Sequence, residues 1–123
     1  MVLRGLALRW RLPLLWLWAT CFPVLAFLYW SPDTAPPTGI ADWDFGLDKP
    51  IHAGTHGFMV LMPALLVSGR WRPFAIGLGF ATAVTLEFGQ LYVPGRSFEV
   101  LDIVANVTGA LLGWWVAVRL REL

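Results

Sequence analysis

Cysteine and charged residues are scarce in this sequence. The single cysteine, Cys21, excludes a disulfide within the chain, and with only two histidines a cysteine-rich structural zinc site is excluded as well. Charged residues make up 14% of the chain, against about 25% in soluble domains. The net charge of +1 and the absence of a basic stripe argue against nucleic acid as a partner.

Apolar residues are abundant instead. They form 58% of the 123 residues, the mean hydropathy is +0.65, and eight residues are tryptophan. A chain of this length is a single domain, residues 1–123. Its composition favours an integral membrane protein over a soluble domain.

Four apolar segments have the length of transmembrane helices. The hydrocarbon core of a bilayer is about 30 Å thick, which a helix of about 20 residues crosses. The predicted fold class is therefore all-α, an integral membrane bundle of four transmembrane helices. The predicted helices are residues 12–30, 49–68, 74–93 and 101–118.

The first of these segments has an alternative interpretation as a cleaved signal peptide. Its end, Phe27-Leu28-Tyr29-Trp30, offers no small residues for a cleavage site, so a retained helix is favoured. Pro13 falls in the first turn of this predicted helix, where proline is tolerated, whereas Pro23 is expected to kink it.

The segments between the predicted helices have the composition of loops. Residues 31–47 are rich in proline, glycine and aspartate, residues 69–73 form a short basic turn, and residues 94–100 begin with Pro-Gly-Arg. Asp48 is predicted to cap the second helix, whose first turn accommodates Pro50.

Basic residues are distributed unequally between the two predicted sides of the membrane. Seven of the nine lie on the side of both termini, and only Lys49 and Arg96 lie opposite. The positive-inside rule therefore places both termini in the cytoplasm. The seven are Arg4, Arg9, Arg11, Arg70, Arg72, Arg119 and Arg121.

Polar residues gather at the predicted outer ends of the helices. Glu87 and Gln90 are three residues apart, and Asp102 and Asn106 are four apart, so each pair shares one helix face. A bundle brings these faces together beside the start of the second helix. The predicted ligand-binding residues are Asp48, Lys49, His52, Glu87, Gln90, Arg96, Asp102 and Asn106.

Glu87 is the deepest of these charged residues, about six residues inside its predicted helix, or roughly 9 Å at about 1.5 Å per residue. An unpaired ionised acid at such a depth costs about 2.5 kcal/mol or more. We expect Arg96 to pair with Glu87, because a guanidinium can hold a carboxylate with two hydrogen bonds. His52 and Asp102 should lie within contact range. The alternative is that these residues only hold the helices together.

Gly109 and Gly113 continue the stripe of Asp102 and Asn106 along the last helix. They form a GxxxG pattern, which allows close approach of a neighbouring helix. We expect both glycines to pack within the bundle.

His52 and His56 have the four-residue spacing of zinc ligands on a helix. No glutamate follows His52, so the HExxH pattern of metalloproteases is absent. A metal site would need a third ligand such as Glu87 or Asp102. The sequence therefore predicts neither a metal ion nor another cofactor.

Taken in chain order, these motifs resemble the VanZ-like family, named for a teicoplanin-resistance protein of bacteria. The resemblance covers residues 48–118 and departs from the family at His56, where a tyrosine is usual. It implies a small multi-pass protein of the bacterial inner membrane that affects the cell envelope and antibiotic resistance. The motifs are Asp48-Lys49-x-x-His52, Glu87-x-x-Gln90, Pro94-Gly95-Arg96 and Asp102-x-x-x-Asn106-x-x-Gly109-x-x-x-Gly113.

Two functions are compatible with such a site. In the first, a non-catalytic protein binds a membrane lipid head group or a lipid-linked cell-wall precursor at the extracytoplasmic face. Arg96 and Lys49 would hold a phosphate or carboxylate, and Gln90 and Asn106 would supply amide hydrogen bonds.

In the second, a small membrane enzyme acts on a lipid-linked substrate. Glu87 or His52 would be its general base, since a desolvated acid and a neutral imidazole both suit proton transfer near neutral pH. The sequence offers no evident nucleophile, which favours the binding function.

Overall fold

The computed structural model describes residues 2–31 and 48–122, with side chains from residues 9–31 and 49–122. The described residues contain helices and no strand, which confirms the all-α fold class. The loop predicted for residues 31–47 and the capping role of the Asp48 side chain lie outside this description. The helices are α1 (Val2–Trp30), α2 (Asp48–Leu66), α3 (Trp71–Gln90) and α4 (Val100–Glu122).

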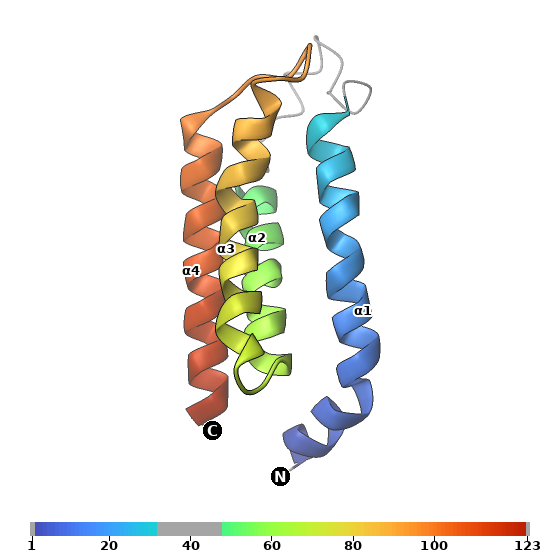
Figure 1. Ribbon diagram of the computed structural model, residues 1–123. Coiled ribbons are helices and arrows are strands. Elements are labelled where there is room, and N and C mark those ends of the chain that lie inside the picture. Colours follow the sequence, from blue (N-terminus) through green and yellow to red (C-terminus); the bar gives the residue numbers. More distant parts are fainter. Residues whose placement is uncertain (1, 32–47, 123) are drawn as a thin grey trace.

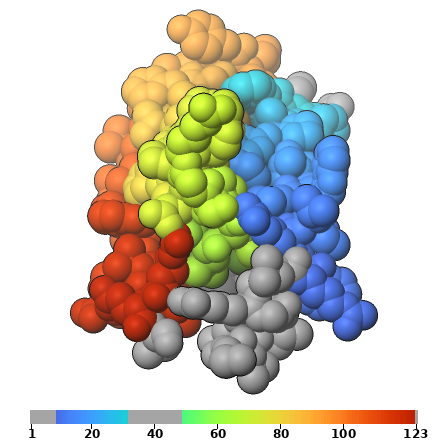
Figure 2. All heavy atoms as spheres, turned by 60° about the horizontal axis from the view of Figure 1, so that its bottom comes forward, coloured from blue at the N-terminus to red at the C-terminus, as the bar shows by residue number. Residues whose placement is uncertain are grey.

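The four helices run side by side along the long axis of the molecule (Figure 1). Both termini and the α2–α3 turn lie at one end, here called the terminal end, and the α3–α4 connection lies at the other, the loop end. Helix α2 contacts all three other helices and packs most extensively on α4. Figure 2 shows the terminal end, where the α2–α3 turn lies between α1 and α4.

Several helix boundaries differ from the predicted ones. Helix α1 begins at Val2 rather than at residue 12, because the segment before it is rich in leucine, alanine and arginine, which favour helix. Pro13 is consequently inside the helix and not in its first turn. Helix α4 continues to Glu122 rather than ending at residue 118, and basic residues in its last turn interact favourably with the helix dipole.

The ends of α2 and α3 also lie earlier than predicted. Helix α2 ends at Leu66, ahead of a turn in which Gly69 adopts a positive φ of 66°. Helix α3 runs from Trp71 to Gln90, and turns over residues 91–95 replace the last turn of the predicted helix. Gly95 has a φ of 79°, a backbone conformation that glycine adopts without steric cost.

Glycines allow α2 and α4 to pack backbone against backbone. A Cβ atom at Gly109 would overlap the backbone of Ala53, and one at Gly113 would overlap that of Gly57. Gly57 itself faces the carbonyl oxygen of Gly109, only 3.0 Å from where its Cβ would lie. The GxxxG residues of α4 therefore face α2 inside the bundle, where any side chain would force the helices apart.

Helix α1 is attached to the other helices by indole hydrogen bonds. Trp18 Nε1 donates to the carbonyl oxygen of Met59 on α2 at 2.9 Å, and Trp30 Nε1 donates to that of Leu86 on α3 at 3.1 Å. Leu25 packs with Met59 and Leu86 in the apolar core between them. These contacts bring the end of α1 beside the polar residues at the loop end.

Polar and ionisable side chains are buried inside the bundle beside its apolar core, and many large apolar side chains are exposed on its outside. His56, Glu87 and Asn106 are 0% exposed, whereas Trp16 and Phe27 of α1 are 72% and 64% exposed. A soluble domain has the reverse arrangement, because water favours charged groups at the surface. Exposed apolar side chains of this number are typical of a surface that meets lipid.

Two helices have both the length and the hydropathy to cross a membrane. They are residues Arg9–Trp30 of α1 and Val100–Glu122 of α4. Leu25 is the one buried residue of the α1 segment, whose other residues are half-buried or exposed.

Candidate functional site

The polar side chains at the loop end form one continuous group, here called the polar cluster. All four helices contribute to it, together with the residues just before α4. Its members are Tyr29, Lys49, His52, His56, Glu87, Gln90, Glu99, Asp102 and Asn106.

Asn106 links three helices through its side-chain amide. Its Nδ2 donates to the carbonyl oxygen of Ala83 on α3 at 3.2 Å, and its Oδ1 lies 3.0 Å from His52 Nδ1 on α2. Because the nitrogen of the amide is a donor to Ala83, the oxygen is the group that faces His52. We therefore assign the imidazole proton to Nδ1, from which it is donated to Asn106.

Glu87 lies next to this hydrogen bond and is fully buried. Its Oε1 is 3.6 Å from His52 Nδ1. The Gln90 side-chain amide, with its nitrogen directed inward, donates to Glu87 Oε2 at 3.2 Å and to the carbonyl oxygen of Ser97 at 3.0 Å. A buried carboxylate needs hydrogen-bond donors. Gln90 supplies one from the same helix, and the imidazole of His52 on α2 lies close by.

Lys49 lies at the edge of the polar cluster between two carboxylates. Its ammonium group donates to Glu99 at 2.9 Å and contacts Asp102 directly. The side chains of Lys49 and Glu99 are 36% and 50% exposed, whereas that of Asp102 is only 11% exposed. The positive charge of Lys49 is therefore shared by two acids, and the cluster is open to its surroundings on this side.

Tyr29 of α1 bridges the two histidines of α2. Its hydroxyl oxygen lies 3.1 Å from His52 Nδ1 and 3.3 Å from His56 Nε2, and its ring meets both imidazoles edge-on. With the proton of His52 on Nδ1, the hydroxyl can donate its own proton to His56. His56 is fully buried, so this hydrogen bond is the one that satisfies its Nε2 in the bundle interior.

Most of the residues predicted to bind a ligand come together in the polar cluster. Arg96 donates to the backbone carbonyl of Leu28 on α1, and its pairing with Glu87 stays a prediction. The side chain of Asp48 lies outside the described part of the structure. The predicted residues in the cluster are Lys49, His52, Glu87, Gln90, Asp102 and Asn106.

Three members of the cluster were not predicted from the sequence. Glu99 precedes Asp102 by three residues, a spacing that does place two side chains on one face. No pattern in the sequence singled out Tyr29, and His56 carried only the spacing of a zinc ligand relative to His52. The contacts of Tyr29 with His52 and His56 depend on how α1 is rotated about its axis, which spacing within a single helix does not reveal.

Three side chains of the cluster are arranged as metal ligands could be. His52, Glu87 and Asp102 each offer a ligand atom, and these atoms all lie within 4.8 Å of one another. Nitrogen and carboxylate oxygen together suit a divalent cation such as zinc. The ammonium group of Lys49 already contacts Asp102, however, so a divalent ion would compete with it for this carboxylate.

A bundle with many exposed apolar side chains and a buried polar cluster at one end is the arrangement expected of an integral membrane protein. The model of one protein family, VanZ/LLP1, matches residues 8–121, almost the whole chain. The chain belongs to the VanZ/LLP1 family. No curated protein and no solved structure matches it. Family membership and two helices able to span a bilayer together indicate a membrane protein.

Proposed function

We propose that all four helices cross the membrane. The support is the apolar exterior of the bundle, which extends to α3, where Phe74, Leu78 and Phe88 are exposed. Helices α2 and α3 carry five of the nine residues of the polar cluster, Lys49, His52 and His56 on α2 and Glu87 and Gln90 on α3. The polar side chains of the cluster face the other helices, where lipid does not reach them.

The orientation that we propose places both termini in the cytoplasm and the polar cluster at the extracytoplasmic face of the inner membrane. Arg70, Arg72, Arg119 and Arg121 all belong to the terminal end, whereas Lys49 and Arg96 belong to the loop end. Basic residues are retained on the cytoplasmic side during insertion, which supports this direction.

The function that we propose is recognition of the polar head of a membrane lipid or of a lipid-linked cell-wall precursor by the polar cluster. The observation that carries it is the gradient of exposure across the cluster. Glu87 and Asn106 are fully buried, while Lys49 and Glu99 form a partly exposed edge. A head group can meet this edge while its acyl chains remain in the bilayer beside the helices.

The charges of the cluster indicate which parts of a ligand it would recognise. Glu87, Glu99 and Asp102 outnumber Lys49, whose ammonium group is shared by two of them. Carboxylates and amide oxygens accept hydrogen bonds, so they suit an amine or hydroxyl group of the ligand. A phosphate would be held by Arg96 at the rim. Through such binding, the protein would affect the cell envelope and its susceptibility to glycopeptide antibiotics.

Native mass spectrometry of the purified protein tests this function. Wild-type protein should retain a defined lipid species, and Asp102→Asn should lose most of it, because the change removes the charge shared with Lys49 but keeps the shape. Thr108→Ala, at an exposed position on the same helix, is the control and should retain the lipid. The same lipids in wild type and Asp102→Asn would contradict the proposal.

The geometry of His52 supports a second candidate function, a membrane enzyme that acts on a lipid-linked substrate. The contacts of Nδ1 with Asn106 and Glu87 fix the orientation of the imidazole, as a general base requires. Glu87→Gln separates the two functions. For an enzyme the change should lower turnover about 100-fold or more, whereas for a binding protein it should leave most lipid retention intact.

A further inference from the structure

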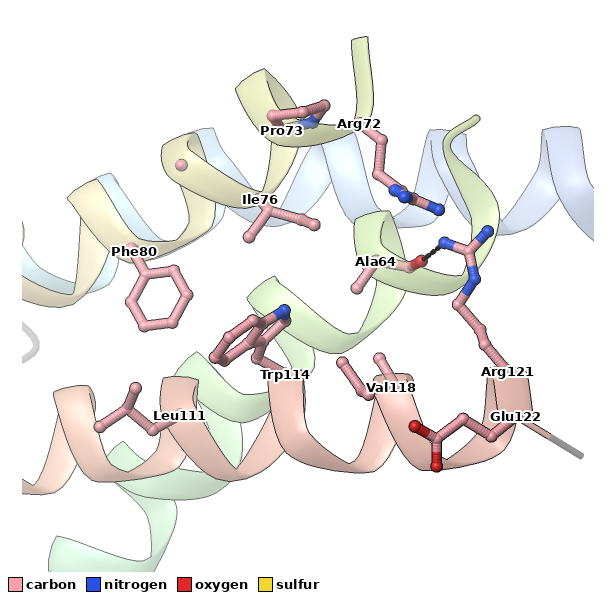
Figure 3. A pocket seen from close by; sticks show the side chains of 12 residues that line it. Ala64, Arg72, Pro73, Ile76, Phe80, Leu111, Trp114, Val118, Arg121 and Glu122 are labelled. Carbon is pink, nitrogen blue, oxygen red and sulfur yellow. Dashed lines mark hydrogen bonds between the residues drawn. The ribbon is translucent and has the colours of Figure 1, made fainter. Parts of the chain in front are cut away.

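A groove lies at the terminal end of the bundle, far from the polar cluster. It has a volume of about 660 Å³ and opens between α3 and α4 (Figure 3). Its apolar wall consists of side chains one turn apart on each helix, Ile76 and Phe80 on α3 and Leu111, Trp114 and Val118 on α4. The groove therefore runs along α3 and α4, from the terminal end of the bundle toward its middle.

Two arginines lie at the mouth of this groove. In Figure 3 the guanidinium groups of Arg72 and Arg121 reach into the same space from α3 and α4. Arg121 Nη1 donates to the carbonyl oxygen of Ala64 at 2.9 Å, a neutral partner that leaves its charge uncompensated. Within residues 9–31 and 49–122, the guanidinium of Arg72 has no hydrogen-bond or ion-pair partner.

The nearby acid does not balance these two charges. Glu122 also lines the groove, but its carboxylate is 3.5 Å from the guanidinium group of Arg119, which lies over the Trp115 ring. Two like charges brought together repel each other unless an anion lies between them. The groove thus combines an apolar wall with two guanidinium groups that no carboxylate of the described residues contacts.

We propose that the groove binds an anionic phospholipid, with its phosphate between Arg72 and Arg121 and an acyl chain along the apolar wall. Phe80 is eight residues from Arg72, so the wall extends about 12 Å from the arginines, at about 1.5 Å per residue. An acyl chain in this strip runs parallel to the helices, as lipids do in a bilayer. Guanidinium groups bind phosphate with paired hydrogen bonds.

The charge of the site selects among lipids that share the phosphate group. The ammonium of phosphatidylethanolamine would lie close to two guanidinium groups and be repelled. Phosphatidylglycerol brings a net negative charge and a neutral head group, so it is the preferred class. The inference depends on the proposed membrane orientation, which directs this end to the cytoplasmic leaflet, where basic pockets between helices recognise acidic lipids.

Lipid retention measures this preference directly. Protein purified from nanodiscs of equimolar phosphatidylglycerol and phosphatidylethanolamine is examined by native mass spectrometry. Wild type should retain phosphatidylglycerol at least fivefold over phosphatidylethanolamine, and the double change Arg72→Ala with Arg121→Ala should bring the ratio close to one. Arg70→Ala is the matched control, because Arg70 lies in the same turn but stacks on Trp71 at 5.1 Å.

A second variant keeps the arginines and fills the groove. Leu111→Trp should reduce retention of phosphatidylglycerol at least threefold while size-exclusion chromatography shows an intact protein. An unchanged ratio in the arginine double variant, or no preference in wild type, would overturn the inference. Displacement of the lipid by millimolar inorganic phosphate would do so as well, because the site would then recognise a free anion.

Failure of lipid binding at the groove can be distinguished from failure of the function proposed for the polar cluster. Asp102→Asn alters the polar cluster, so it should lose the lipid bound there but retain as much phosphatidylglycerol as wild type. Resistance of the protein to extraction by alkaline carbonate reports its membrane insertion independently of both sites.

Discussion

Asn106 shows how a single side chain joins the helices of this bundle. It is fully buried, and its two hydrogen bonds reach His52 on α2 and Ala83 on α3. Because its oxygen accepts and its nitrogen donates, it also sets the position of the proton on His52. The amide therefore contributes both to stability and to the orientation of the imidazole.

Replacing Asn106 by leucine should destabilise the protein. The change keeps the volume but leaves the Nδ1 proton of His52 without its amide acceptor, at an expected cost of about 1–3 kcal/mol. Thermal unfolding in detergent measures the effect, with Thr108→Leu at an exposed position of α4 as the control. Equal stability of Asn106→Leu and wild type would show that the hydrogen bonds of this amide are dispensable.

Glu87 and Arg96 remain predicted electrostatic partners. A double-mutant cycle with Glu87→Gln and Arg96→Ala tests the pair by thermal unfolding. If the two interact, Arg96→Ala alone should be more damaging than the double change, with non-additivity of about 1 kcal/mol or more. Strict additivity would mean that the carboxylate is stabilised by His52 and Gln90 without Arg96.

The sequence was sufficient to place together those residues of the polar cluster that lie on the same face of one helix. Spacing placed Glu87 with Gln90, and Asp102 with Asn106, because residues three or four apart share a helix face. It did not reveal that Tyr29 reaches His56 or that Lys49 pairs with Glu99. Those contacts depend on the rotation and tilt of one helix relative to another.

Helix packing in this protein depends on the absence of side chains where α2 and α4 meet. Gly109 and Gly113 place the two backbones in contact, and Gly79 on α3 does the same against Met59 of α2, whose carbonyl oxygen would be 2.6 Å from an added Cβ. The GxxxG spacing was visible in the sequence, and its orientation toward α2 required the three-dimensional structure. The extension of α1 to Val2 was missed because residues 2–11, which include three arginines, were assigned by hydropathy and not by helix propensity.

Gly109→Leu should lower the yield of folded protein by several fold. The new side chain would overlap the backbone of Ala53, which cannot move without separating α2 from α4. Monodisperse protein recovered after size-exclusion chromatography is the measurement. Leu112→Ala, at an exposed position on the same helix, should leave the yield unchanged. Full recovery of Gly109→Leu would show that α2 and α4 are less closely packed.

The whole molecule is organised as a bundle with different chemistry at its two ends. The loop end holds the buried polar cluster, and the terminal end holds the arginines and the apolar groove. Between them the exposed surface is apolar, which fits a protein surrounded by lipid. The lengths of the apolar segments were sufficient to predict the helical class. The groove arises from the relative placement of α3 and α4 and had no signal in the sequence.

Labelling of single cysteines tests the central proposal, a membrane bundle with its polar cluster at the extracytoplasmic face. Ser97 and Ser68 are exposed residues at the loop end and the terminal end, and cysteine replaces serine with little change in size. In a Cys21→Ser background, an impermeant thiol reagent added to intact cells should label Ser97→Cys. Ser68→Cys should react only after the membrane is opened. Labelling of Ser68→Cys in intact cells, with Ser97→Cys protected, would contradict the proposed orientation and place the polar cluster in the cytoplasm.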